Sequence, residues 1–175
     1  MKKLVLFVAF FLSGCVTVNE MVQSPIQGSA YNSIYNKTFE RPTTVKYEEM
    51  AGQVRLYIEV DEYGLDYSRV WFDQKRVVEY ITLIDKFERW HGVAINDDDI
   101  LNREIGIAST SGGLNIKFSF FSGNSQKHYL VMQGGVLGEY SGGIALNYEN
   151  VIHLRVLLEE FKANTLNITD KSKYN

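Results

Sequence analysis

Residues 53–73 read QVRLYIEVDEYGLDYSRVWFD, and this stretch decides the class of fold. From residue 53 to residue 60, apolar side chains alternate with Arg55, Tyr57 and Glu59, a period of two that is typical of a strand with one buried face. The residues on the apolar side are Val54, Leu56, Ile58 and Val60. The segment DEYG at 61–64 predicts a turn and residues 65–72 a second strand, so the stretch is expected to form a β-hairpin.

The period then changes from two to about 3.6. Apolar residues on one face of the predicted helix are Val77, Tyr80, Ile81, Ile84 and Phe87. Asp73 is placed to cap the start of this helix, and Gly92 is expected to end it. The polar segment that follows, INDDDILNRE, is expected to be a loop.

Further strands are expected at 104–110, 114–121 and 127–133, with a short one around Ile144 and a final helix over 148–163. The inward-facing residues expected in that helix are Val151, Leu154, Leu158 and Phe161. The two helical stretches align at an offset of 74 residues, which pairs Val77 with Val151 and Phe87 with Phe161 and indicates a weak strand-strand-helix internal repeat. The predicted fold is a single α+β domain: a mainly antiparallel β-sheet with two amphipathic helices on one face.

The N-terminus has a different character. Met1 is followed by two lysines, then by nine apolar residues at 4–12, then by Ser-Gly-Cys. A helix of nine residues rises about 13 Å, against about 30 Å of hydrocarbon, so the run is too short to span a bilayer. A basic start, a short apolar run and small residues before a cleavage site are the layout of a secretory signal.

The residues LSGC at 12–15 resemble the lipobox of bacterial lipoproteins. The resemblance covers only the first fifteen residues and implies cleavage before Cys15, a diacylglyceryl group on its sulfur and a further acyl chain on the new N-terminus. Two or three acyl chains anchor a protein stably, at about 0.8 kcal/mol per buried CH₂. Residue 16 is Val rather than the Asp that favours inner-membrane retention, so in a Gram-negative cell the resemblance implies the outer membrane, facing the periplasm.

Cys15 is the only cysteine, so the folded part would contain no disulfide and would depend on its core. Removal of residues 1–14 leaves 16 basic and 21 acidic residues, a net charge of about −5. Because no basic stripe is visible, nucleic acid is not expected as a partner.

The expected organisation is a signal peptide at 1–14, a lipidated N-terminus and tether at 15–45, the α+β domain at 46–163 and a polar, fraying tail at 164–175. Within the tether, Tyr31, Tyr35 and Phe39 recur every four residues and predict one face of a short helix.

Motifs for catalysis, cofactors or metals are not evident. The glycine-rich segment QGGVLGEYSGG matches neither the phosphate-binding loop nor the dinucleotide fingerprint and is expected to form turns and bulges. The acidic segment at 96–99 fails the EF-hand order, and His91, His128 and His153 lack the spacing of a zinc site. We therefore expect no catalytic residues, no cofactor and no metal. Carboxylates that only the fold brings together, with Glu59, Asp61 and Glu62 as candidates, remain an alternative.

The outward-facing positions of the predicted strands hold more aromatic side chains than a solvated face needs. They are Tyr57, Tyr63, Tyr67, Trp71, Phe121, Tyr129 and Tyr140, and the predicted binding surface consists of Tyr57, Tyr67, Trp71, Phe121 and Tyr129. The leading hypothesis is a membrane-anchored, non-enzymatic envelope lipoprotein that binds another envelope protein or a cell-wall polymer. The alternatives are an envelope hydrolase and a small inhibitor or phage-exclusion lipoprotein.

Overall fold

The predicted hairpin forms the centre of a four-stranded sheet. The computed structural model describes residues 18–32, 34–35, 37–62, 67–124, 126–136, 138–170 and 172. The strands of this sheet, in spatial order, are β1 (Val18–Val22), β4 (Thr43–Met50), β5 (Gln53–Asp61) and β6 (Tyr67–Asp73). Leu56, Ile58 and Val60 are fully buried, which confirms the predicted inner face of β5.

A second sheet has six strands. In spatial order they are β3 (Lys37–Glu40), β2 (Ser29–Asn32), β10 (Glu139–Asn147), β9 (His128–Val136), β8 (Leu114–Ser122) and β7 (Leu101–Ser109). Every pairing between the named strands is antiparallel. The chain is thus a single α+β domain with mainly antiparallel sheets, as predicted.

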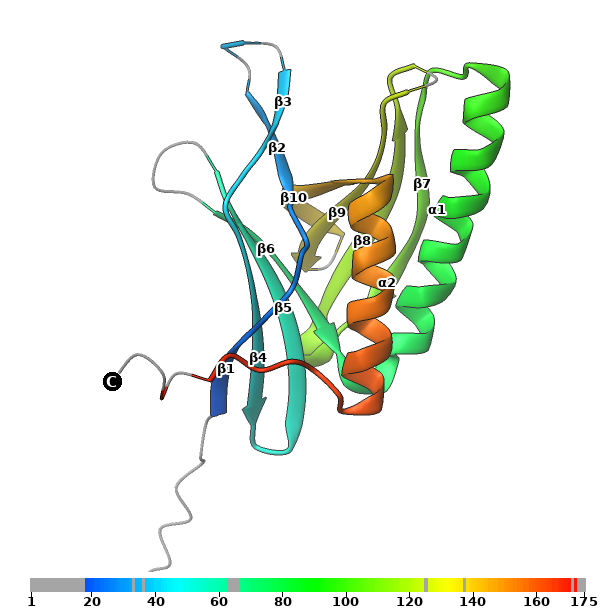
Figure 1. Ribbon diagram of the computed structural model, residues 1–175. Coiled ribbons are helices and arrows are strands. Elements are labelled where there is room, and N and C mark those ends of the chain that lie inside the picture. The colour runs from blue at the N-terminus through cyan, green and yellow to red at the C-terminus, as the bar shows by residue number, and fades with distance from the viewer. Residues whose placement is uncertain are drawn as a thin grey trace, which may run out of the picture.

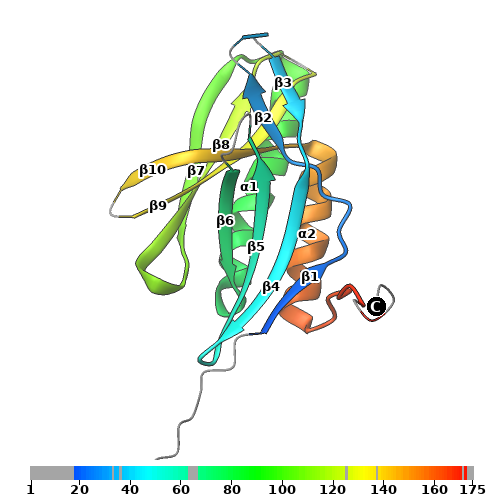
Figure 2. The ribbon, with the colours of Figure 1, turned by 90° about the vertical axis from the view of Figure 1, so that its left-hand side faces the viewer.

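The two helices share one side of the six-stranded sheet. α1 (Val77–Asp97) contacts β7 and β8, and α2 (Tyr148–Ala163) contacts β9 and β10. They lie side by side (Figure 1), and β4, β5 and β6 close over them from another direction (Figure 2). The antiparallel strands therefore form two sheets rather than one. Two helices, each about 10 Å across, are covered on two sides by separate sheets that share one core.

The start of α2 is confirmed, whereas Asp73 caps the 3₁₀ turn that precedes α1 rather than α1 itself. The Asp73 carboxylate accepts a hydrogen bond of 2.9 Å from the Lys75 backbone N–H, capping a short 3₁₀ turn, η1 (Gln74–Arg76), that leads into α1. The Asn147 side chain accepts one of 3.0 Å from the Asn150 N–H at the start of α2. The inward-facing residues predicted for α2, namely Val151, Leu154, Leu158 and Phe161, are all buried.

α1 does not end at Gly92, contrary to prediction. It continues to Asp97, and Asp98 ends it in a left-handed conformation at φ 52°. Ala94, in the added turn, is 2% exposed, and Asn96 donates a hydrogen bond of 3.0 Å to the Gly92 carbonyl. Ala94 is the buried residue of this otherwise exposed turn, and its burial opposes the unfavourable helix propensity of Gly92, about 1 kcal/mol.

The expected tether at 15–45 belongs to the domain from Val18 onward. Val22 and Ile26 are buried, and the Gln27 N–H donates a hydrogen bond of 2.7 Å to the Asn150 side chain. The short helix predicted around Tyr35 is also wrong, because β2 and β3 form an antiparallel pair there. A spacing of four residues fits one face of a helix, but it equally fits one face of a strand. Cys15, the signal segment and Tyr63 lie outside the described residues.

The tail at 164–170 does not fray as predicted. It runs along the free edge of β1, where the Gln23 N–H donates to the Asn167 carbonyl at 2.8 Å and the Thr169 N–H to the Met21 carbonyl at 2.8 Å. Leu166 and Ile168 pack against the core. Two apolar residues within a polar sequence are enough to seat this segment on an unpaired strand edge.

The element order supports the internal repeat in part. An antiparallel strand pair precedes each helix, β5 and β6 before α1 and β9 and β10 before α2. The aligned residues Val77, Phe87, Val151 and Phe161 are all buried. The two pairs lie in different sheets, so the repeated halves do not share one sheet.

Tyr80 joins the first helix to both sheets. Its ring lies 5.1 Å from the Phe72 ring of β6 and 6.4 Å from the Phe118 ring of β8. Its hydroxyl donates to the Ser109 carbonyl at 2.9 Å and accepts from the Asp73 N–H at 3.1 Å. Burial raises the pKa of Tyr80, as expected for a phenol inside the core.

We predict that Tyr80→Phe destabilises the protein by about 1–3 kcal/mol, because a buried N–H and a buried carbonyl would each lose a hydrogen-bond partner. Urea unfolding measures the loss. Tyr148→Phe, at a ring that is 40% exposed, is the matched control and should have little effect. Equal stability of Tyr80→Phe and the parent would contradict the structural role given to this hydroxyl.

Candidate functional site

Three of the five predicted surface residues come together on the outer side of the four-stranded sheet. Tyr57 on β5 lies opposite Trp71 on β6, and Tyr67 lies at the start of β6. Between them is Arg69, whose guanidinium carbon is 4.8 Å from the Tyr67 ring centroid, 5.0 Å from that of Tyr57 and 5.7 Å from that of Trp71. One cation is thus shared by three aromatic rings.

Glu59 holds this cation in place. Its carboxylate accepts two hydrogen bonds from Arg69, one of them 2.8 Å long from Nε, and its other oxygen lies 3.4 Å from Lys46 Nζ. Burial alone would raise the pKa of Glu59, but the bonds and charge of Arg69, with the charge of Lys46, outweigh it and lower that pKa. Burial by itself would lower the pKa of Arg69. The hydrogen bonds and the charge of Glu59 outweigh burial and raise that pKa. We name Tyr57, Glu59, Tyr67, Arg69 and Trp71 the aromatic face.

The exposure of the rings differs from the prediction at one position. Tyr57 points outward but is only 6% exposed, since Lys46, Arg69 and Asn19 cover it. Tyr67 is 53% exposed and Trp71 is half-buried, so these two rings present the accessible aromatic surface. Arg69 and Lys46 were missed at the sequence level, because only the register of β4, β5 and β6 places both charges beside Tyr57.

The other two predicted residues lie elsewhere. Phe121 on β8 and Tyr129 on β9 are opposite each other in the six-stranded sheet, with ring centroids 6.4 Å apart. Phe121 is 40% exposed. Within the described part of the chain, no ring contact joins this pair to the aromatic face, so the five predicted residues form two separate surfaces.

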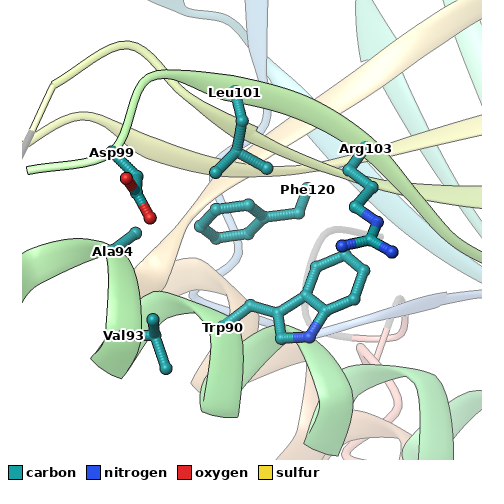
Figure 3. Close-up of a pocket in the computed structure, with 7 residues that line it drawn as sticks. All are labelled: Trp90, Val93, Ala94, Asp99, Leu101, Arg103 and Phe120. Atoms are coloured by element: carbon teal, nitrogen blue, oxygen red, sulfur yellow. The ribbon is translucent and has the colours of Figure 1, made fainter. Parts of the chain in front are cut away.

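A pocket of about 270 Å³ lies between the last turns of α1 and the neighbouring strands β7 and β8 (Figure 3). Its lining residues are Trp90, Val93, Ala94, Asp99, Leu101, Arg103 and Phe120. The Trp90 and Phe120 rings meet edge to face at 6.1 Å, and two cations, Lys86 at 4.8 Å and Arg103 at 5.3 Å, lie over the indole. The pocket offers a small apolar site with an acid at one end and a base at the other.

A pair of histidines lies next to this pocket, with the His128 ring 5.6 Å from the ring of Phe120, one of the lining residues. His91 near the end of α1 and His128 at the start of β9 meet through their Nδ1 atoms at 2.8 Å, and His91 stacks on Tyr148 at 4.0 Å. His128 is 3% exposed, and its Nε2 atom is buried without a partner. No sequence pattern predicts this pair, because its members are 37 residues apart and belong to different elements.

The hydrogen bond between the histidines needs one N–H and one unprotonated nitrogen. Burial, and secondarily the positive charge that His128 would bring, lowers the pKa of His91. The folded state therefore favours an uncharged His91.

Of the acids considered for hydrolysis, Glu59 is paired with Arg69 and does not suit the role of a general acid. A general acid needs a raised pKa, whereas that of Glu59 is lowered. Glu62 accepts a hydrogen bond from Ser68, and the Asp61 backbone carbonyl accepts one from Arg41. In the described ranges, no group of three or more His, Cys, Asp or Glu side chains is placed to hold a metal. No helix there combines the length and apolar character that crossing a bilayer requires.

Comparisons with protein-family models, with curated proteins and with solved structures found no match to this chain. Function is therefore inferred from the side chains and their geometry.

We predict that stability falls in mild acid. The pKa of His91 is lowered on folding, so the unfolded chain takes up a proton near pH 6.5 that the folded chain does not bind. The contribution of His91 to the free energy of unfolding is then fully present above about pH 6.5. It is lost, by up to about 1.4 kcal/mol per pH unit, as the pH drops from there towards the lowered pKa.

Urea unfolding over a pH series measures this loss. His91→Gln keeps a hydrogen-bonding group but removes the titration, and it should flatten the pH dependence. His153→Gln on α2 is the control and should leave it as in the parent. A pH dependence unchanged by His91→Gln would show that other groups cause it.

Proposed function

We propose that this chain is a lipid-anchored protein of the bacterial cell envelope that binds a partner protein through its aromatic face. The anchor is supported by the order of the N-terminal residues: two lysines, an apolar run too short to span a membrane, and LSGC. Acylation of Cys15 would hold the domain at the membrane surface. In a Gram-negative cell the surface would be that of the outer membrane, facing the periplasm.

The observation that carries the binding proposal is the placement of Arg69 among Tyr57, Tyr67 and Trp71. Tyrosine, tryptophan and arginine are the residue types that dominate binding energy at protein interfaces. Here Glu59 already fixes the arginine, so little side-chain freedom would be lost when a partner binds. The rings and the ion pair stand on β-strands, which are rigid supports for a binding surface.

A cell-wall polymer is the second candidate partner. The exposed Tyr67 ring and the half-buried Trp71 ring are apolar surfaces on which a sugar can stack, with Glu59 and Arg69 as hydrogen-bonding groups beside them. An inhibitor of a hostile enzyme or of an incoming phage would use the same face for a foreign protein. The hydrolase alternative has the least support, because the pKa of Glu59 is lowered by Arg69.

We predict that Cys15→Ala abolishes acylation and signal processing, since the sulfur that carries the lipid would be missing. Metabolic labelling with a fatty-acid probe and the mass of the mature protein measure both. Equal labelling of Cys15→Ala and the parent would overturn the lipoprotein assignment.

We predict that Trp71→Ala and Arg69→Ala weaken partner binding by about 2 kcal/mol each, roughly thirtyfold in Kd. Crosslinking in intact cells followed by affinity capture identifies the partner, and titration of the purified partner gives the Kd. Phe121→Ala, an exposed ring on the other sheet, is the matched control and should bind as the parent does. Loss of binding in Phe121→Ala alone would contradict the proposal and place the binding site on the six-stranded sheet. Capture of cell-wall material without any protein would favour the polymer as partner.

A further inference from the structure

The folded domain begins very close to the proposed anchor. β1 starts at Val18, three residues after Cys15. Three residues of fully extended chain span at most about 11 Å. If the acyl chains on Cys15 lie in the bilayer, Val18 lies within that distance of the lipid headgroups.

The turn between β4 and β5 extends past Val18 at this same end. Val18 is paired with Glu49, and the hairpin closes at the pair Met50 and Gln53. Because β1 and β4 are antiparallel, Val18 lies at the end of the sheet where β4 enters its turn. The turn lies about two residues beyond Glu49, or about 7 Å. Cys15 is within about 11 Å of Val18 along the chain, so headgroups that face this end of the sheet would lie within about 4 Å of the tip of the turn.

From this geometry we infer that the β4–β5 turn, Met50–Gln53, rests on the surface of the membrane and contacts zwitterionic phospholipid headgroups. This inference rests on the proposed lipid anchor. It goes beyond the anchor because it fixes which end of the domain meets the lipid. Figure 1 and Figure 2 show the turn and the start of β1 at one end and the β8–β9 connection at the other.

The chemistry of the turn fits such a contact. Met50 is 39% exposed, and Ala51 adopts the left-handed conformation at φ 51°. Turns that need this conformation usually contain Asn, Asp or Gly, whose side chains are polar or absent. Here the tip is Ala51–Gly52, with Gly52 at φ 74°, and the apolar Met50 precedes it at the end of β4.

The charges around the turn indicate the kind of lipid. Among the described residues at this end of the domain, acidic ones predominate. They are Glu20 on β1, Glu48 and Glu49 on β4, and Asp170 on the tail that lies along β1. Burial first, and then the charges of Glu49 and Glu20, raise the pKa of the neighbouring Tyr47. Arg55 and Lys75 beside the turn oppose these acids but are outnumbered. An anionic lipid surface would be repelled, whereas a zwitterionic one would not.

A fluorophore on the acylated, full-length protein tests the contact. Acylation consumes the Cys15 sulfur, so a single introduced cysteine is the one thiol that a maleimide label can modify. Met50→Cys reports on the turn, and Gln126→Cys, an exposed position between β8 and β9, reports on the opposite end.

Both labelled proteins are reconstituted into phosphatidylethanolamine–phosphatidylcholine vesicles containing a lipid with a spin label near its headgroup. We expect several-fold stronger quenching at position 50 than at position 126. Replacing part of the zwitterionic lipid with phosphatidylglycerol should reduce quenching at position 50.

The outcomes separate this inference from the anchor. A protein that carries the acyl mass and floats with the vesicles, but is quenched equally at the two positions, would overturn the contact and leave the anchor intact. A protein that carries no acyl group and does not float would overturn both. Unchanged or stronger quenching at position 50 with phosphatidylglycerol would overturn the choice of zwitterionic headgroups. Circular dichroism checks that both labelled variants are folded.

Discussion

Both sheets bury their inner faces against the same two helices, and the rest of the structure depends on this shared core. Each sheet has only one apolar face, and neither could exclude water alone. Buried residues of β5, β8, β9, α1 and α2 therefore belong to a single cluster. Because the helices occupy the inner side, the outer side of the four-stranded sheet is left to solvent. That is where Arg69 and its three rings are found.

Where the two sheets meet, glycine allows β6 to lie against β9 and β10. A Cβ atom at Gly134 would lie 3.3 Å from the Arg69 carbonyl oxygen and 3.8 Å from the Trp71 ring. Gly142, at φ 63°, lies against Ser68, whose hydroxyl accepts a hydrogen bond of 2.9 Å from the Gly143 N–H. The glycine-rich segment thus has a packing role, because Gly134 and Gly142 let β9 and β10 lie close to Trp71 and Ser68 of β6.

The proposed anchor and the aromatic face are compatible in space. β5 runs from the end that we assign to the membrane towards the other end of the domain, and β6 runs antiparallel to it along the same length. The aromatic face therefore stands along the side of the domain rather than on its membrane-facing end. A partner in the periplasm could reach Tyr67 and Trp71 while the lipid chains stay inserted.

The sequence by itself determined the helices and strands in which apolar residues recur with a clear period over several turns or pleats. β5, β8, the start of α1 and the whole of α2 follow from local alternation and caps, and the α+β class follows from them. The LSGC motif is also a local signal, although it remains a prediction. Tertiary structure alone decided the rest. β1 and the tail are seated by a few apolar residues, the last turn of α1 is stabilised by burial of Ala94, and His91 meets His128 across 37 residues. These contacts join segments far apart in the chain, and a one-dimensional pattern records the period of each segment but not its neighbours in space.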